Sequence, residues 1–167
     1  TLTYSPHRQW GLGRTLYNGQ SRRSMYTFWK RTSPPPSMVA FDAPTREVCA
    51  VRRSRTNTPL QALVLLNDPN YVAAARSLAK LAMTETGESV GQQIDYMFRR
   101  AVSRFPTGDE KRVLSDRYEK ALVAFQKDPK AAAGLAGSET KSNDAVVAAW
   151  TVVASVILNL DEVITRE

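Results

Sequence analysis

The residues best suited to chemistry or ligand binding gather in one segment, between positions 21 and 66. Arginine makes bidentate hydrogen bonds to carboxylate, sulfate or phosphate, and aromatic rings can stack on sugars or bases. The segment is rich in both kinds of side chain, and the candidate ligand-binding or docking residues are Arg22, Arg23, Tyr26, Trp29, Arg31, Arg46, Arg52, Arg53 and Arg55. This composition predicts a surface for an anionic ligand or for a neighbouring domain.

Two acidic residues lie within the same segment, Asp42 and Glu47. Paired carboxylates can act as general acid and base at a glycosidic bond, so both are weak candidates for catalytic residues. Acids five positions apart in a turn-rich stretch more often bind arginines or cap helices. The favoured single interpretation of the segment is therefore structural, with arginines bridging backbone carbonyls and carboxylates. Binding of an anionic glycan, and then of nucleic acid, are the alternatives.

Several other kinds of site are excluded or disfavoured by the rarity of their residues. The chain has one cysteine, Cys49, and one histidine, His7, which excludes an intrachain disulfide and a zinc site of the usual Cys/His type. A Ser-His-Asp triad would have to recruit His7 from near the start of the chain. No metal and no cofactor is predicted for this chain. We expect Cys49 to be a buried, small hydrophobic residue.

The charge of the chain is distributed unevenly. Residues 1–58 carry ten Lys and Arg against two acids, whereas residues 59–167 carry thirteen against fourteen, so the whole excess of the net charge of +7 lies in the first third. The most apolar stretch, residues 145–160, is shorter than the roughly 20 residues that cross a bilayer. It therefore predicts a buried helix and no membrane span.

The elements that must position these residues are predicted to be helices. Thr58 and Asp68 precede prolines and are expected to cap helices over residues 59–66 and 69–84. Further helices are expected from residue 89 to the Phe105-Pro106 pair, over residues 107–127 and over residues 143–161, with a helical turn after Asp128 and a loop over residues 133–143. The apolar stripes predict inward-facing residues that include Ala74, Leu81, Val113 and Trp150.

The predicted fold class is all-α, a small helical bundle of four or five helices with an irregular, basic, proline-containing N-terminal arm. The arm covers residues 1–57, with one short helix over 24–31, a polyproline segment at 34–36 and extended chain over 37–57. Residues 58–167 form the bundle, on which the arm packs, and the last helix lies centrally because it is apolar nearly all round. The acids at 161 and 162 are expected to end that helix and to pair with an arginine of the first third. The missing initiator Met predicts a piece of a longer protein.

The stretch RRSMYTFWKRTSPPPSMVAFDAPTREVCAVRRSRTNTPLQALVLLNDPNYVAAARSLA, residues 22–79, resembles the C-terminal signature of the planctomycete-type domain of unknown function 1553. The ending AAWTVVASVILNLDEVITRE is similar to the terminal helix of that family. The resemblance implies the C-terminal part of a large exported protein, periplasmic or extracellular, in Planctomycetes-like bacteria. Such proteins often contain a companion domain of unknown function 1549 and a c-type cytochrome module. A haem c module would lie elsewhere in the protein, because the chain lacks C-x-x-C-H.

The expected function follows from the arm and the resemblance together. We expect a non-catalytic or co-catalytic module associated with polysaccharide, whose Arg/aromatic segment contacts an anionic glycan or docks on upstream domains of the same polypeptide. The alternative is part of the active site of a glycan-acting hydrolase or oxidative enzyme completed by those domains. Nucleic-acid binding is the second alternative, and the expected export counts against it. This chain alone is not expected to be an enzyme.

Overall fold

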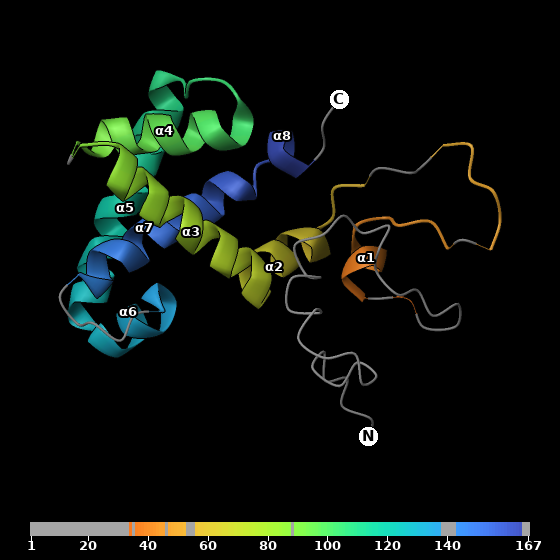
Figure 1. Cartoon of the computed structure of the whole chain (residues 1–167), viewed down its shortest axis with the longest axis horizontal. Coiled ribbons are helices and arrows are strands. Elements are labelled where there is room, and N and C mark those ends of the chain that lie inside the picture. The colour runs from red at the N-terminus through yellow and green to blue at the C-terminus, as the bar shows by residue number, and fades with distance from the viewer. Residues whose placement is uncertain are drawn as a thin grey trace.

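The structure, a computed structural model, describes residues 34, 36–45, 47–52, 56–87, 89–137 and 143–164, and these contain eight helices and no strand (Figure 1). The helices are α1 (Pro36–Ala40), α2 (Pro59–Asn67), α3 (Pro69–Glu85), α4 (Val90–Val102), α5 (Gly108–Lys127), α6 (Pro129–Ala136), α7 (Asp144–Leu158) and α8 (Asp161–Ile164). The predicted all-α class is confirmed, with more helices than the expected four or five.

Side-chain caps explain where most of these helices begin. The Thr58 hydroxyl accepts a hydrogen bond from the Gln61 N–H, and the Gln61 amide oxygen accepts one from the Thr58 N–H, which completes a capping box at α2. Thr107 and Glu110 repeat this box at α5. The carboxylate of Asp68 caps α3. These local signals place the helix starts within a residue of the predicted positions.

Two helices meet at Asp68, and two others meet at Asp128. The N–H of Asp68 donates to the Val64 carbonyl at the end of α2, while its carboxylate accepts from Asn70 N–H at the start of α3. Asp128 does the same between α5 and α6. Each pair of helices is thus joined by a single residue.

Residues 34–36 were expected to form polyproline and residues 37–57 extended chain, and this expectation was wrong at Pro36–Ala40. Pro36 begins the short helix α1, because proline at the first helical position already has the φ angle of a helix and loses no hydrogen bond there. The helix ends at Ala40, and Asp42, two residues later, has a φ of 55°. The N–H groups of Asp42 and Ala43 donate to the carbonyls of Val39 and Met38, the two bonds of a Schellman motif.

The C-terminal third also differs from the prediction. The helix that starts at Pro129 is two turns long and reaches Ala136, so the expected loop starts at Gly137, in the left-handed conformation. The last predicted helix is broken, since α7 ends at Leu158 and α8 begins at Asp161. The acids at 161 and 162 consequently start a helix, where the macrodipole favours them, and do not end one.

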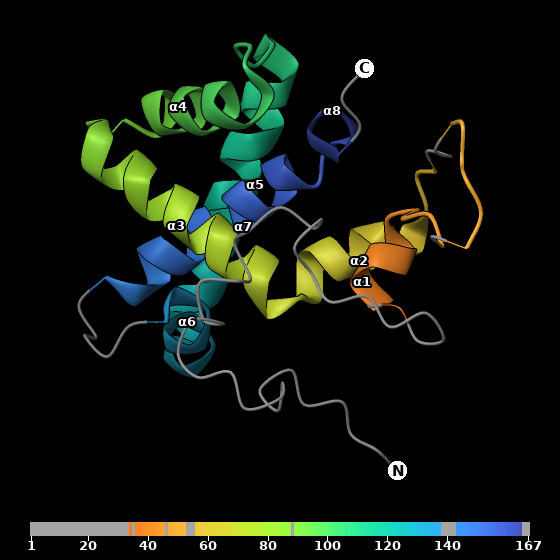
Figure 2. The ribbon, with the colours of Figure 1, turned by 45° about the vertical axis from the view of Figure 1, so that its right-hand side comes forward.

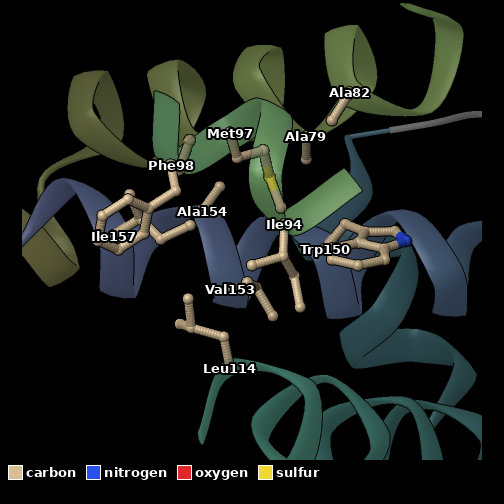
Figure 3. Packing of buried hydrophobic residues seen from close by; sticks show 11 residues of the cluster. Ala79, Ala82, Ile94, Met97, Phe98, Leu114, Trp150, Val153, Ala154 and Ile157 are labelled. Carbon is tan, nitrogen blue, oxygen red and sulfur yellow. The ribbon is translucent and has the colours of Figure 1, made fainter. Parts of the chain in front are cut away.

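The core lies around α7, which contacts α3, α4, α5 and α6. Its buried residues interleave with Ile94, Met97 and Phe98 of α4 and Leu114 of α5 (Figure 3). Small residues on α3, at positions 75, 79 and 82, let that helix lie close to α7. Trp150 is buried, as predicted, and stacks on Tyr118 with 4.1 Å between ring centroids. The central position of this apolar helix is confirmed.

Some predicted burial was wrong. Ala74, Leu81 and Val113 are exposed, because each lies beside the true inward stripe of its helix and not on it. Cys49 is also exposed, since residues 47–52 have no regular structure and no core to enter. Among the described residues, no helix is both long and apolar enough to cross a membrane.

Candidate functional site

The structure describes only part of the predicted ligand-binding or docking segment. Arg52 is described and exposed to solvent. The other candidates lie outside the described residues, namely Arg22, Arg23, Tyr26, Trp29, Arg31, Arg46, Arg53 and Arg55. Their convergence on a site therefore stays a prediction, and the described part of the arm is represented by α1, Asp42, Glu47 and Arg52.

Asp42 is held as a structural acceptor at the junction of α1 and α2. One oxygen of its carboxylate, Oδ2, accepts hydrogen bonds from the Thr56 N–H at 2.8 Å, the Thr56 hydroxyl at 2.7 Å and Gln61 Nε2 at 3.4 Å. Gln61 is 1% exposed, so these contacts satisfy a buried amide. An aspartate tolerates the left-handed conformation better than most residues, but glycine would fit more easily. The Asp42 side chain therefore does more than allow the turn, because its hydrogen bonds to Thr56 and Gln61 fix the start of α2.

Glu47 lies in a different setting from Asp42. Its side chain is exposed, and its backbone N–H donates to the Thr45 hydroxyl at 3.5 Å. The catalytic pairing of the two carboxylates stays a prediction, and the contacts of Asp42 agree better with the structural interpretation of the arm.

The short helix α2 buries Gln61 and Leu65 and exposes its other three leucines. Leu60, Leu63 and Leu66 are 59%, 57% and 44% exposed, whereas Gln61 is buried. The three leucines recur every three positions, so they follow one side of the helix. We call them the leucine face. Figures 1 and 2 show that α2 extends away from α4, α5 and α6 toward α1. Sequence reasoning identified α2 as apolar but not which side is buried.

A cleft of about 230 Å³ opens between α2, α3, α5, α6 and α7. It is lined by Leu66, Val72, Ala75, Arg117, Leu135, Thr151, Val152, Ser155 and Val156. No sequence motif predicts this cleft, because its lining residues come from five different helices. The residue Leu66 belongs both to this cleft and to the leucine face.

A hollow of about 420 Å³ on the outside of α4 is lined by Tyr96, Arg99 and Arg100. The guanidinium of Arg99 lies 5.3 Å from the ring centroid of the exposed Phe105. This grouping repeats, within the described bundle, the combination of arginine and aromatic residues predicted for the arm. The sequence gives little signal for it, because Arg99 and Arg100 lie in the part of the chain that has no excess of basic residues.

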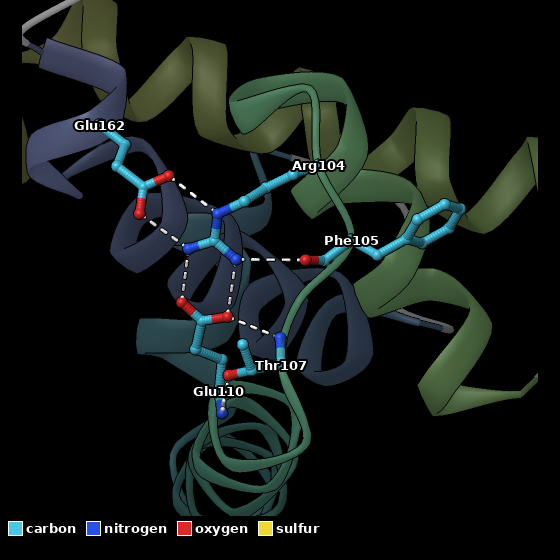
Figure 4. A network of polar contacts seen from close by, with 5 residues as sticks. All are labelled: Arg104, Phe105, Thr107, Glu110 and Glu162. Carbon is cyan, nitrogen blue, oxygen red and sulfur yellow. Dashed lines mark hydrogen bonds and ion pairs between the residues drawn. The ribbon is translucent and has the colours of Figure 1, made fainter.

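Arg104 is the centre of the densest polar network among the described residues (Figure 4). All five of its N–H groups donate, forming one bidentate pair with Glu110, a second with Glu162, and a bond to the Phe105 carbonyl. The acids at 161 and 162 were predicted to pair with an arginine of the first third, which was wrong for Glu162 and stays a prediction for Asp161. Arg104 pairs with Glu162 instead, because the break at Asn159 turns α8 toward the start of α5.

The network shifts the pKa values of its members. Hydrogen bonds from Arg104, and then from the Thr107 N–H, lower the pKa of Glu110 to about 2. Hydrogen bonds from Arg104 also lower the pKa of Glu162, and both carboxylates raise the pKa of Arg104. One guanidinium and two carboxylates are charged at neutral pH, so the network has a net charge of −1, and its hydrogen bonds join α8 to the bundle.

The described residues contain no group of three or more His, Cys, Asp or Glu that could hold a metal ion. Comparison with curated proteins and with solved structures finds no match in either.

One protein-family profile, described as protein of unknown function (DUF1553) and abbreviated PSD1, matches residues 3–118. This region includes the whole Arg/aromatic segment and the helices from α1 to most of α5. The C-terminal helices, which resemble the end of the family by their sequence, lie beyond the matched residues. Because the match covers more than half of the chain, the protein belongs to the DUF1553 family.

Proposed function

We propose that this chain is a non-catalytic docking module of an exported multidomain protein. Its basic arm and its leucine face bind the preceding domains of the same polypeptide. The export and the upstream domains rest on the family resemblance, and the docking rests on α2. The single observation that carries the proposal is the exposure of Leu60, Leu63 and Leu66 on a helix that buries Gln61.

Solvent exposure of three leucines in one stripe is costly unless another surface covers them. Burial of apolar area stabilises an association by roughly 25 cal/mol for each Å², and clustered apolar side chains on a folded surface commonly mark an interface. The helix that bears them is fixed firmly, since Asp42, Thr58 and Gln61 hold its first turn. A rigid apolar stripe, in a chain whose first third is strongly basic in sequence, suits a partner with an apolar patch and an acidic rim.

The test uses this chain and the upstream remainder of the same protein, expressed separately. We expect the two to form a 1:1 complex by analytical ultracentrifugation. The double variant Leu60→Ser/Leu63→Ser should weaken the complex by at least tenfold. Val123→Ser, which changes an exposed valine on α5, serves as the matched control and should leave it intact. Equal binding by the leucine variant and the unchanged chain would refute docking through this face.

Contact with an anionic polysaccharide is the second candidate function. The exposed Arg52, the Arg/aromatic composition of the arm, and the Tyr96–Arg99–Arg100 hollow favour it. A glycan array that includes sulfated and uronic acid polymers tests it. The variants Arg52→Ala and Arg99→Ala/Arg100→Ala separate the arm from the hollow on α4. Binding that neither variant reduces, or no binding at all, would remove this candidate.

A further inference from the structure

We propose that the cleft between α2, α3, α5, α6 and α7 binds a small apolar monocarboxylate, an aromatic or branched aliphatic acid. The cleft shares Leu66 with the leucine face, while Leu60 and Leu63 lie outside its lining. The ligand class follows from the size of the cleft, the apolar character of its walls, and two polar groups that have no hydrogen-bond partner among the described residues.

The walls and the volume set the size and nature of the ligand. Most of the lining is aliphatic, contributed by Leu66, Val72, Leu135, Val152 and Val156. A cavity of about 150 Å³ lined by such residues holds one benzene ring. The cleft has a volume of about 230 Å³, which accommodates a ring and a short polar group beside it. The small volume excludes nucleotides and oligosaccharides.

Two polar groups at the cleft define the charge of the ligand. Arg117 lines the cleft, and among the described residues its guanidinium has no hydrogen bond, ion pair or ring contact. The Ser155 hydroxyl likewise has no hydrogen bond within the described part of the chain. None of the lining residues that the structure describes is acidic. Arg117 is exposed to solvent and Ser155 is half-buried, and both line the same largely aliphatic cleft. A guanidinium and a hydroxyl are suitable hydrogen-bond donors to a carboxylate.

Thr151, the third polar residue of the lining, differs from Arg117 and Ser155 because its hydroxyl has a hydrogen-bond partner. Its hydroxyl donates to the Val147 carbonyl of its own helix at 2.7 Å, so it is satisfied within α7. It therefore adds a methyl group to the wall and needs no ligand. This leaves Arg117 and Ser155 to orient the carboxylate, with the apolar part of the ligand lying against the aliphatic residues.

The cleft is formed before any ligand binds, because the contacts of its walls are fixed. Arg76 Nε donates to the Leu135 carbonyl at 2.7 Å and ties the end of α6 to α3. The helix α7 lies in the core and cannot move without disturbing Val153 and Ile157. A preformed site loses little conformational freedom on binding, which favours even a small ligand.

The test is a titration of the ¹⁵N-labelled chain with phenylacetate, followed by NMR. We expect saturable shifts of amide signals from the lining, at Val72, Leu135 and Ser155. Phenylacetamide has the same shape without the charge and should bind at least tenfold more weakly, since hydrogen bonds to charged groups are the stronger ones.

The variants assign the two polar contacts. Arg117→Gln should weaken phenylacetate binding at least tenfold and leave phenylacetamide binding unchanged, and Ser155→Ala should weaken phenylacetate by a smaller factor. Arg112→Gln is the matched control, because Arg112 is an exposed arginine of the same helix outside the cleft. The docking variant Leu60→Ser/Leu63→Ser should also bind phenylacetate normally, which separates this proposal from docking.

Two results would overturn the proposal. Shifts that do not saturate, or that appear outside the lining, mean that no such site exists. Equal affinity for the acid and the amide, or an unaltered acid affinity in Arg117→Gln, means that the cleft does not recognise a carboxylate. The circular dichroism spectrum of each variant confirms that a loss of binding is not a loss of fold.

Discussion

Gly137 lies directly against the guanidinium of Arg76. Gly137 has a φ of 60° at the end of α6, and a Cβ added there would lie 2.7 Å from Arg76 Cζ. The same arginine donates to the Leu135 carbonyl, so the absence of a side chain at 137 allows Arg76 to reach the end of α6. A cation at the C-terminal end of a helix is also favoured by the macrodipole.

Gly137→Ala should therefore destabilise the protein. A left-handed conformation costs an alanine roughly 1–2 kcal/mol, and displacement of Arg76 adds to this cost. Gly134→Ala in the same helix is the control, because nothing lies within 4 Å of its added Cβ and alanine is favoured over glycine there by roughly 0.5–1 kcal/mol. Urea unfolding of both variants measures the difference. An unchanged midpoint for Gly137→Ala would contradict this account.

Replacement of Arg104 should release α8 while the bundle stays folded. Arg104→Gln removes both bidentate pairs, and Arg104→Lys keeps the charge but cannot bind both carboxylates in the same manner. We expect faster hydrogen exchange at the Val163 N–H, which bonds to the Leu160 carbonyl, in both variants. Arg112→Gln breaks an exposed pair with Asp109 and should leave this exchange rate unchanged. Protection of Val163 that survives in Arg104→Gln would show that the network does not hold α8.

Stability should fall in acid because of the same network. The pKa of Glu110 is lowered from 4.5 to about 2, so its contribution is fully present above pH 4.5 and is lost as the pH falls toward 2. Glu162, whose pKa is also lowered, adds a loss of the same sign. Both groups are largely exposed, so the effect is modest and weakens with salt. Thermal unfolding from pH 6 to pH 2 should show a shallower decline in Glu110→Gln than in the unchanged protein.

Asp42→Ala should loosen the start of α2. The Thr56 N–H and hydroxyl lose their acceptor, and the buried Gln61 amide loses one of its partners, at a cost of roughly 1–3 kcal/mol. Asp42→Asn keeps an oxygen acceptor and tolerates the left-handed φ, so it should retain most of the stability. Hydrogen exchange at the Thr56 N–H measures the change directly. If the Ala and Asn variants exchange at the same rate there, the carboxylate is not what fixes α2.

The helix starts could be predicted from the sequence because caps are local. Thr58 with Gln61, and Thr107 with Glu110, lie three positions apart, and each pair contains the whole signal. The break at Asn159 could not be predicted in this way. The apolar pattern runs through it, and the turn depends on α8 reaching Arg104, whose partner Glu162 is 58 positions away.

The candidate sites also differ in whether local sequence or tertiary packing reveals them. The excess of arginine in the first third is a property of composition and needs no structure to be recognised. The cleft requires the packing of five helices before Arg117 and Ser155 line one space. The leucine face is intermediate, because the sequence shows an apolar helix, while only the burial of Gln61 reveals which side is exposed.

The single-residue junction at Asp68 has a mechanical consequence. Only Asp68 lies between α2 and α3, and both its N–H and its carboxylate form hydrogen bonds. The angle between the two helices therefore has little freedom to change. A force applied to α2 at the leucine face would be transmitted through Asp68 to α3, whose buried alanines pack in the core beside α7. Tension between this chain and a neighbouring domain would thus act on the centre of the bundle and would not be absorbed at its surface.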